Sequence, residues 1–259
     1  MAYLNSNNGR LFYELEGEAG KEVLVFSNSL GTDHSLWNLQ VPEVLKQFRV
    51  LRYDVRGHGQ SETTSGPYSI KLLANDVLEL LDHLELEKAN FCGISIGGLT
   101  GQWLGIHAPE RIDKLIIANS AAKIGTTEGW NERIDSVRKN GLASIEEATR
   151  QRWFTPEFVA ANPELVEEVL RVFVQTDPEG YCSCCAAVRD ADFRQDISRI
   201  QAPTLVIAGT EDKVCTVEDG GLLAENIPDA RQVNLKAAHI SNIEAAADFS
   251  RLLINFCSS

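Results

Sequence analysis

The sequence has 259 residues, of which 44% are hydrophobic and 24% are charged, values that are ordinary for a globular protein with a buried core. The formal net charge of −13 argues against binding to nucleic acid or to anionic membrane surfaces, which attract basic proteins. The same charge would repel an anionic substrate at long range, so such a substrate would need cations placed locally at its site.

Apolar runs, the first residues and the cysteines indicate where the protein works and whether it binds a metal. No apolar run approaches the roughly 18 residues that a membrane span requires, and the first residues show no basic segment followed by an apolar one, so we expect no signal peptide. The six cysteines have no disulfide-type spacing, which favours a reduced, cytoplasmic chain. Cys182, Cys184 and Cys185 lack a second group of Cys or His residues, so we predict packing there and no metal site. The sequence makes no prediction of oligomeric state.

Strands and helices alternate along the first half of the chain. Residues 1–17 alternate in polarity as a β-hairpin does, with a turn at Asn7-Asn8-Gly9. Short apolar runs and helical spacings follow in turn, which predicts a mostly parallel sheet covered on both faces by helices. The expected strands are 23–26, 49–54, 89–92 and 115–119, and the expected helices are 37–47, 70–84 and 99–107.

The alternation stops after residue 122. Residues 125–190 contain charged helical patterns and no clear strand, and strands return at 203–209 and 232–235. We therefore predict an α/β core formed by residues 1–124 and 191–259. The helical cap, residues 125–190, is expected to cover one end of the sheet.

Ser95 lies at the centre of a Gly-x-Ser-x-Gly motif, residues 93–97, between a predicted strand and a predicted helix. In that setting the motif marks a nucleophile elbow, a tight turn that lifts the serine hydroxyl clear of the sheet. The crowded turn leaves room only for small residues, which Gly93, Gly97 and Gly98 provide. A glycine-rich turn without a catalytic role is the alternative, and the flanking strand and helix favour the elbow.

A serine nucleophile needs a base, and the base needs a carboxylate to orient it. In this topology the acid and then the histidine follow later strands along the chain. Asp212 follows the strand at 203–209, with Glu211 as the alternative acid, and His239 follows the strand at 232–235. We therefore predict a Ser95–Asp212–His239 triad.

The oxyanion of an acyl-transfer reaction needs two backbone N–H donors. One is predicted at Ile96, directly after the nucleophile, and the other at Leu30 in the loop after the first buried strand, with Ser29 as the alternative. His34 follows the same loop and is a candidate for the site entrance. His58 lies in a Gly-punctuated turn, where bracing of the backbone is the expected role.

Segments 27–33, 53–59 and 93–98 resemble the α/β-hydrolase family, and the resemblance extends over essentially the whole chain. It implies an α/β-hydrolase fold with a mostly parallel eight-stranded sheet, flanking helices and an all-helical cap inserted after the sixth strand. The cap is similar to that of the enol-lactonases of this family in segments 121–126, 130–134, 152–156 and 181–187. That similarity implies hydrolysis of 3-oxoadipate enol-lactone, a small anionic lactone of aromatic catabolism, through an acyl-enzyme and without a cofactor.

Because this substrate carries a free carboxylate, the resemblance predicts a cation in the cap. Arg133 is favoured, with Arg138 and Arg152 as further candidates, and surface ion pairing is the alternative for all three. Trp130 and Trp153 are expected to wall the pocket, with core packing as the alternative. The same triad would also serve a carbon–carbon bond hydrolase, a carboxylesterase or a perhydrolase. A catalytically idle relative that only binds a small ligand is a further alternative.

Overall fold

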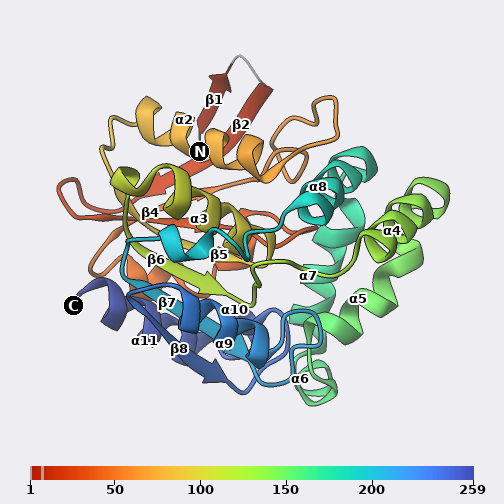
Figure 1. Ribbon diagram of the computed structural model, residues 1–259. Coiled ribbons are helices and arrows are strands. Elements are labelled where there is room, and N and C mark those ends of the chain that lie inside the picture. Colours follow the sequence, from red (N-terminus) through yellow and green to blue (C-terminus); the bar gives the residue numbers. More distant parts are fainter. Residues whose placement is uncertain (1, 7–8) are drawn as a thin grey trace.

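The computed structural model describes residues 2–6 and 9–259 (Figure 1). Its strands are β1 (Ala2–Ser6), β2 (Gly9–Glu16), β3 (Val23–Ser27), β4 (Arg49–Tyr53), β5 (Ala89–Ile94), β6 (Ile112–Ala118), β7 (Thr204–Gly209) and β8 (Ala230–Leu235). Within the described residues these strands form one eight-stranded sheet, in the order β1-β2-β4-β3-β5-β6-β7-β8.

The sheet is antiparallel only at its first edge. β1 pairs with β2, and β2 with β4, in antiparallel fashion, whereas every neighbouring pair from β4 to β8 is parallel. The predicted hairpin and the mostly parallel sheet are therefore confirmed. Of the predicted hairpin turn, Asn7 and Asn8 lie outside the described residues, and Gly9 begins β2.

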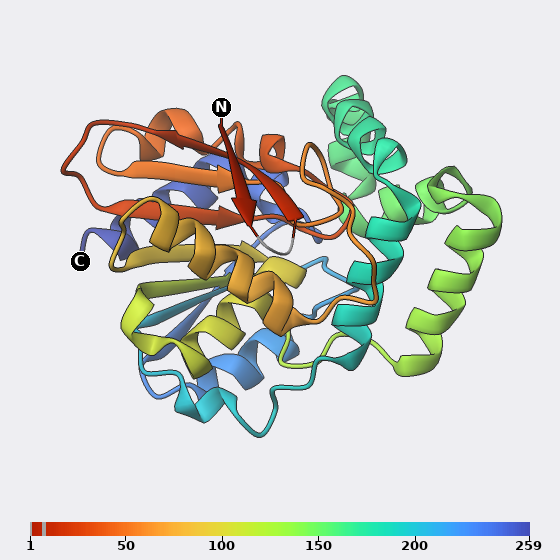
Figure 2. The same cartoon turned by 90° about the horizontal axis from the view of Figure 1, so that it is seen from above.

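Helices cover both faces of this sheet. They are α1 (Val41–Val44), α2 (Ile70–His83), α3 (Ile96–His107), α9 (Val217–Asn226), α10 (Ser241–Glu244) and α11 (Ala246–Cys257). Figure 2 shows α2 and α3 on one face and α11 on the other. Among the described helices, none combines the length and the apolarity needed to cross a membrane.

The prediction of one continuous helix over residues 37–47 is wrong. The chain makes a 3₁₀ turn at His34–Trp37 and then the short helix α1. Pro42 explains the break, because proline lacks the N–H of a helical hydrogen bond and its ring clashes with the carbonyl four residues earlier. The break leaves Trp37 stacked on Phe26 of β3, with ring centroids 4.4 Å apart.

Five helices lie between β6 and β7, as expected of an insertion after the sixth strand. They are α4 (Thr127–Asn140), α5 (Glu146–Trp153), α6 (Pro156–Ala161), α7 (Pro163–Gln175) and α8 (Pro178–Asp190). Prolines at the first positions of α6, α7 and α8 set where these helices begin, because proline is accommodated where no helical N–H is needed. In both views the helical cap gathers at one end of the sheet (Figures 1 and 2). That residues 125–190 form a unit separate from the core stays a prediction.

The turn between β5 and α3 is packed so closely that side chains are excluded. A Cβ on Gly93 would lie 2.1 Å from the carbonyl oxygen of Gly97, and a Cβ on Gly97 would lie 2.4 Å from the carbonyl oxygen of Ser27. Ser95, between them, has a φ of 58°, in the left-handed region that non-glycine residues rarely occupy. The glycines of the motif therefore let β5, β3 and α3 meet at this point.

We predict that Gly93→Ala strongly destabilises the protein, because the new methyl group would meet backbone that cannot rotate away. Overpacking of this kind typically costs about 1–3 kcal/mol. Gly221→Ala in α9 is the matched control, since its Cβ would meet only Oε1 of Gln232, at 3.5 Å. Alanine there should stabilise the helix by about 0.5–1 kcal/mol. Thermal unfolding measures both, and equal melting temperatures for the two variants would contradict the prediction.

Candidate active site

Ser95 is held at the elbow by its own backbone. Its N–H donates to the carbonyl of Ala118 at 3.0 Å, and its carbonyl accepts from Oγ of Ser120 at 2.8 Å. These bonds reach from the end of β6 and fix a backbone conformation that would otherwise relax. The hydroxyl is left free to face the cavity described below.

Asp212 and His239 meet although they lie on different loops, after β7 and β8. The imidazole Nδ1 and the Asp212 Oδ2 are 2.8 Å apart, and since a carboxylate only accepts, Nδ1 carries the proton and Nε2 is the free acceptor. Oδ1 of Asp212 accepts from the backbone N–H groups of Val214 and Cys215 at 2.7 and 3.1 Å. The alternative acid, Glu211, is exposed to solvent and has no bond to the imidazole.

The surroundings of Asp212 keep its carboxylate ionised. Burial alone would raise the pKa of this carboxyl group. The charge and hydrogen bond of His239, with further hydrogen bonds from Asn119 and Val214, outweigh burial and hold the pKa below its ordinary value. An ionised acid is what an imidazole base needs to stabilise its protonated form.

Asn119 supports this pair, and sequence reasoning placed it only at the end of a strand. Its Nδ2 donates to Oδ2 of Asp212 at 3.0 Å and to the carbonyl of Ala238 at 3.2 Å, and its Oδ1 accepts from the hydroxyl of Ser241. The side chain is buried, and φ is 44°. Asparagine tolerates this conformation better than most residues, which was the only sequence-level signal for its role.

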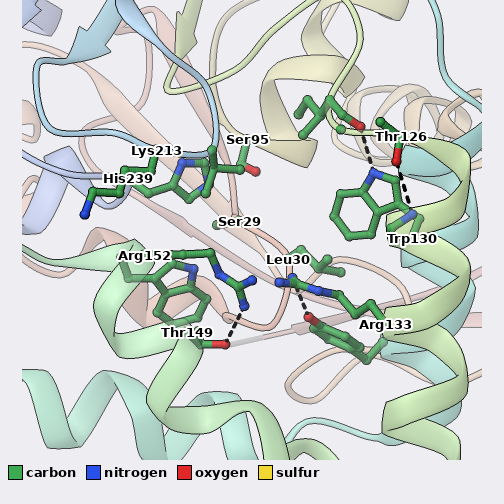
Figure 3. Close-up of a pocket in the computed structure, with 16 residues that line it drawn as sticks. Ser29, Leu30, Ser95, Thr126, Trp130, Arg133, Thr149, Arg152, Lys213 and His239 are labelled. Atoms are coloured by element: carbon green, nitrogen blue, oxygen red, sulfur yellow. Dashed lines mark hydrogen bonds between the residues drawn. The ribbon is translucent and has the colours of Figure 1, made fainter.

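Ser95 and His239 line one cavity of about 270 Å³ beneath the helical cap. Figure 3 shows both on the same side of that cavity. No hydrogen bond joins the Ser95 hydroxyl to the imidazole in the described part of the chain, and bonds of this kind often tighten only as the transition state forms. The other lining residues are Ser29, Leu30, Ile124, Gly125, Thr126, Gly129, Trp130, Arg133, Thr149, Arg152, Trp153, Tyr181, Lys213 and Val214.

The predicted oxyanion donors come from two segments, the start of α3 and the loop after β3. Ile96 is the first residue of α3, so its N–H belongs to the set that no helical carbonyl accepts. Leu30 and the alternative, Ser29, both line the cavity from the loop after β3. Parallel strands that end at the same edge of the sheet bring these two loops together.

Two arginines of the helical cap face the cavity without a carboxylate partner among the described residues. Nη1 of Arg133 donates to the hydroxyl of Tyr181 at 3.2 Å, and its guanidinium lies 5.3 Å from the ring centroid of Trp130. Nη2 of Arg152 donates to Oγ1 of Thr149 at 3.3 Å. Figure 3 shows the two guanidinium groups pointing toward each other.

The surroundings of Arg152 disfavour the positive charge of its guanidinium group. Burial, and then the charge of Arg133, lower its pKa to about 10. An anion bound between the two groups would relieve that repulsion. Arg138 differs, because it is exposed and forms an ion pair with Glu179 at 3.1 Å, so the surface ion-pair alternative holds for this arginine.

The predicted pocket walls, Trp130 and Trp153, both line the cavity. Trp130 is partly exposed and donates its indole N–H to the carbonyl of Ile124 at 2.7 Å, while Trp153 is buried against Phe173. Sequence reasoning missed Tyr181 as the hydroxyl partner of Arg133, and also missed Lys213 in the lining. Lys213 directly follows the predicted acid, which is the signal that could have suggested it.

The remaining histidines lie outside the cavity lining. His34 is not at the entrance; its Nδ1 lies 2.8 Å from Asp54. Nε2 of His58 accepts a hydrogen bond from the backbone N–H of Gly31 at 3.0 Å, which braces that loop.

Asp33, His34 and Asp54 form the one group of three metal-type ligands in the described chain, but both oxygens of Asp54 already accept hydrogen bonds.

The cysteines are all free and buried. In α8, the thiols of Cys182 and Cys184 lie 3.8 and 3.6 Å from the carbonyl oxygens of Ile134 and Arg56, respectively. Burial raises the pKa of the Cys185 thiol to about 12, so it remains protonated at neutral pH. These are the surroundings of packed helix residues.

Comparison with known proteins assigns this chain to a family. A family model described as the alpha/beta hydrolase fold matches residues 22–246, and the chain belongs to that family. It is 47% identical to 3-oxoadipate enol-lactonase 2 of Acinetobacter baylyi, over 95% of this chain and 92% of that protein. It is 41% identical to 3-oxoadipate enol-lactonase 1 of the same organism, over 98% and 96% of the two chains. The crystal structure of the enol-lactonase from Burkholderia xenovorans superposes with a TM-score of 0.98 at 44% identity, covering 100% of both chains.

We predict that Asn119→Gly lowers kcat for ester hydrolysis while leaving the chain folded. Glycine accepts the positive φ of this position, so the loss is that of the side-chain hydrogen bonds. A buried acceptor left without its partner costs about 1–3 kcal/mol, which corresponds to roughly 10–100-fold in rate. Glu85→Gly is the matched control, because Glu85 has a φ of 55° and is exposed. Equal kcat values for the two variants would show that Asn119 does not support the acid.

Proposed function

We propose that this chain is a serine hydrolase that opens the lactone ester of 3-oxoadipate enol-lactone to give 3-oxoadipate, a step of the β-ketoadipate pathway of aromatic catabolism. One observation carries the proposal. A serine elbow and a buried Asp212–His239 pair face a cavity whose far wall holds two arginines without carboxylate partners. The names of the two Acinetobacter relatives support the same substrate, and that of the Burkholderia structure supports an enol-lactone.

Acylation begins at the nucleophile. Nε2 of His239 accepts the proton of the Ser95 hydroxyl as its oxygen attacks the lactone carbonyl carbon. The carbonyl oxygen becomes an oxyanion that accepts from the N–H groups of Leu30 and Ile96. When the tetrahedral intermediate collapses, the ring C–O bond breaks and the enol oxygen leaves with the proton held by His239. The released enol then ketonises, so the acyl-enzyme already carries the ketone of the product.

Deacylation repeats the same proton transfers with water. His239 accepts a proton from a water molecule, whose oxygen attacks the acyl carbon. Collapse of the second intermediate returns the proton to Ser95 and releases the new carboxylic acid, which then loses its proton to solvent. Asp212 remains ionised throughout and stabilises the protonated imidazole, which the lowered pKa of its carboxyl group favours.

The free carboxylate of the substrate gives Arg133 and Arg152 their role. In a chain with a net charge of −13, an anion gains nothing from the overall field and depends on local cations. Guanidinium groups suit this task because their planar N–H donors match the two oxygens of a carboxylate. Trp130 and Trp153 would shield these charges from water and so strengthen the contact.

We also propose that the protein works in a reducing compartment, the cytoplasm. Support comes from the six cysteines, all of which are free thiols buried in the described structure.

Purified protein mixed with 3-oxoadipate enol-lactone should remove the absorbance of the enol-lactone, and Ser95→Ala should abolish that turnover. The alanine variant keeps the elbow backbone, so its circular dichroism and melting curve should match those of the unsubstituted chain. Turnover retained in the folded Ser95→Ala variant would refute the nucleophile. Hydrolysis of neutral aryl esters without hydrolysis of the lactone would refute the substrate.

We predict that Arg133→Ala and Arg152→Ala each lower kcat/KM for the anionic lactone by roughly 10–100-fold, mostly through KM. A hydrogen bond to a charged group is worth about 1.5–3 kcal/mol, and that range sets the expected loss. A neutral aryl ester should be hydrolysed with nearly unchanged kcat/KM. Arg138→Ala is the control, because Arg138 lies on the same helix as Arg133 but pairs with Glu179 outside the cavity. An equal loss on both substrates would rule out carboxylate binding by these arginines.

A further inference from the structure

The loop that carries Leu30 is a tight turn, fixed by hydrogen bonds and by packing against the helical cap. The N–H of Thr32 donates to the carbonyl of Ser29 at 3.2 Å, and Gly31, the third residue of the turn, has a φ of 80°. These are the features of a type II β-turn, which requires glycine at that position. A Cβ on Gly31 would lie 2.6 Å from the ring of Phe173, so α7 of the helical cap also packs on the turn.

Thr32 holds the peptide plane that contains the predicted oxyanion donor. Its Oγ1 donates to the carbonyl oxygen of Ser29 at 2.8 Å, in addition to the bond from its own N–H. The Ser29 carbonyl and the Leu30 N–H belong to one planar peptide unit, which is trans. Because the two groups point in opposite directions across a trans peptide, fixing the carbonyl also fixes the direction of the N–H.

His58 holds the next peptide plane from the other side. Its Nε2 accepts the N–H of Gly31 at 3.0 Å, while its Nδ1 lies 3.3 Å from the carbonyl oxygen of Arg56, which assigns the proton to Nδ1. The imidazole is buried, and burial lowers its pKa, so it stays the neutral acceptor that this bond needs. Asp33, Asp54 and Asp177 lie near enough to oppose that shift in part.

We propose that Thr32 and His58 are positioning residues that lock this turn and thereby aim the Leu30 N–H at the oxyanion. The inference rests on the proposed serine-hydrolase function and assigns these two side chains a role in it. Neither side chain lines the catalytic cavity, so neither touches substrate. A mobile Leu30 N–H would have to be ordered as the oxyanion forms, and this cost would fall on the transition state and spare substrate binding.

The test compares variants that keep the hydrogen bond with variants that lose it. Thr32→Val removes the hydroxyl at nearly constant volume, and Thr32→Ser keeps it. His58→Leu removes the acceptor, and His58→Gln offers an amide oxygen near the position of Nε2. Loss of a complete oxyanion donor costs roughly 10²–10³ in kcat, so the valine and leucine variants should lose about tenfold or more, with KM nearly constant. The serine and glutamine variants should recover most of that kcat.

Thr204→Val is the matched control for loss of a buried hydroxyl. Oγ1 of Thr204 donates to the carbonyl of Ala202 at 2.8 Å, at the start of β7 and so at the opposite end of the strand from the cavity. The Thr204→Val variant should lower the melting temperature about as much as Thr32→Val does and leave kcat unchanged. A kcat for Thr32→Val equal to that of Thr32→Ser, or a loss confined to KM, would overturn the proposal. If Thr32→Val does not fold, Thr32→Ala and the His58 pair answer the same question.

A neutral aryl ester serves as the main substrate, so that the result does not depend on the lactone. If the unsubstituted protein cleaves the aryl ester and spares the enol-lactone, the proposed substrate fails while the positioning role can still be measured. If Thr32 and His58 variants keep full kcat on both substrates, the positioning role fails and the proposed function stands.

Discussion

The site depends on one steric constraint, the close approach of backbone at the turn between β5 and α3. Ser95 occupies a left-handed conformation there, and glycines at positions 93 and 97 let the strand, the helix and the neighbouring β3 loop come within contact distance. Hydrogen bonds from the end of β6 keep the conformation from relaxing. Ser95, the predicted nucleophile, and both predicted oxyanion donors are therefore placed by the same packing.

Parallel strands convert this local constraint into a site. Because β3, β5, β7 and β8 run in one direction, the loops that follow them open at the same edge of the sheet. The Asp212–His239 pair, the Leu30 turn and the elbow meet at that edge although they lie far apart in the chain. Asn119, at the end of β6, links the acid to the loop that carries His239.

The helical cap places two arginines at the cavity, although the chain as a whole is acidic. The chain carries 37 acidic and 24 basic residues, so its overall field repels anions. Arg133 and Arg152 oppose this field only at short range, from helices that close over the cavity. Their mutual repulsion and the absence of a carboxylate partner in the described structure are what the proposed binding of an anion at this wall rests on. A core that provides chemistry and a cap that provides recognition would explain how one fold serves many substrates.

The sequence by itself determined the order of strands and helices, the insertion after β6 and the candidates Ser95, Asp212 and His239. These follow from short-range signals: hydrophobic periodicity, a five-residue glycine–serine motif and the position of polar residues after strands. It favoured Asp212 but left Glu211 open as the alternative acid. It could not separate Arg152 from Arg138, because both are cap arginines that differ only in what they face. Nor could it assign Asn119 to the acid or Thr32 and His58 to the turn, and it joined residues 37–47 into one helix across a proline. Those contacts join backbone and side chains that become neighbours only when the sheet and the cap are packed, so only the tertiary structure decided them.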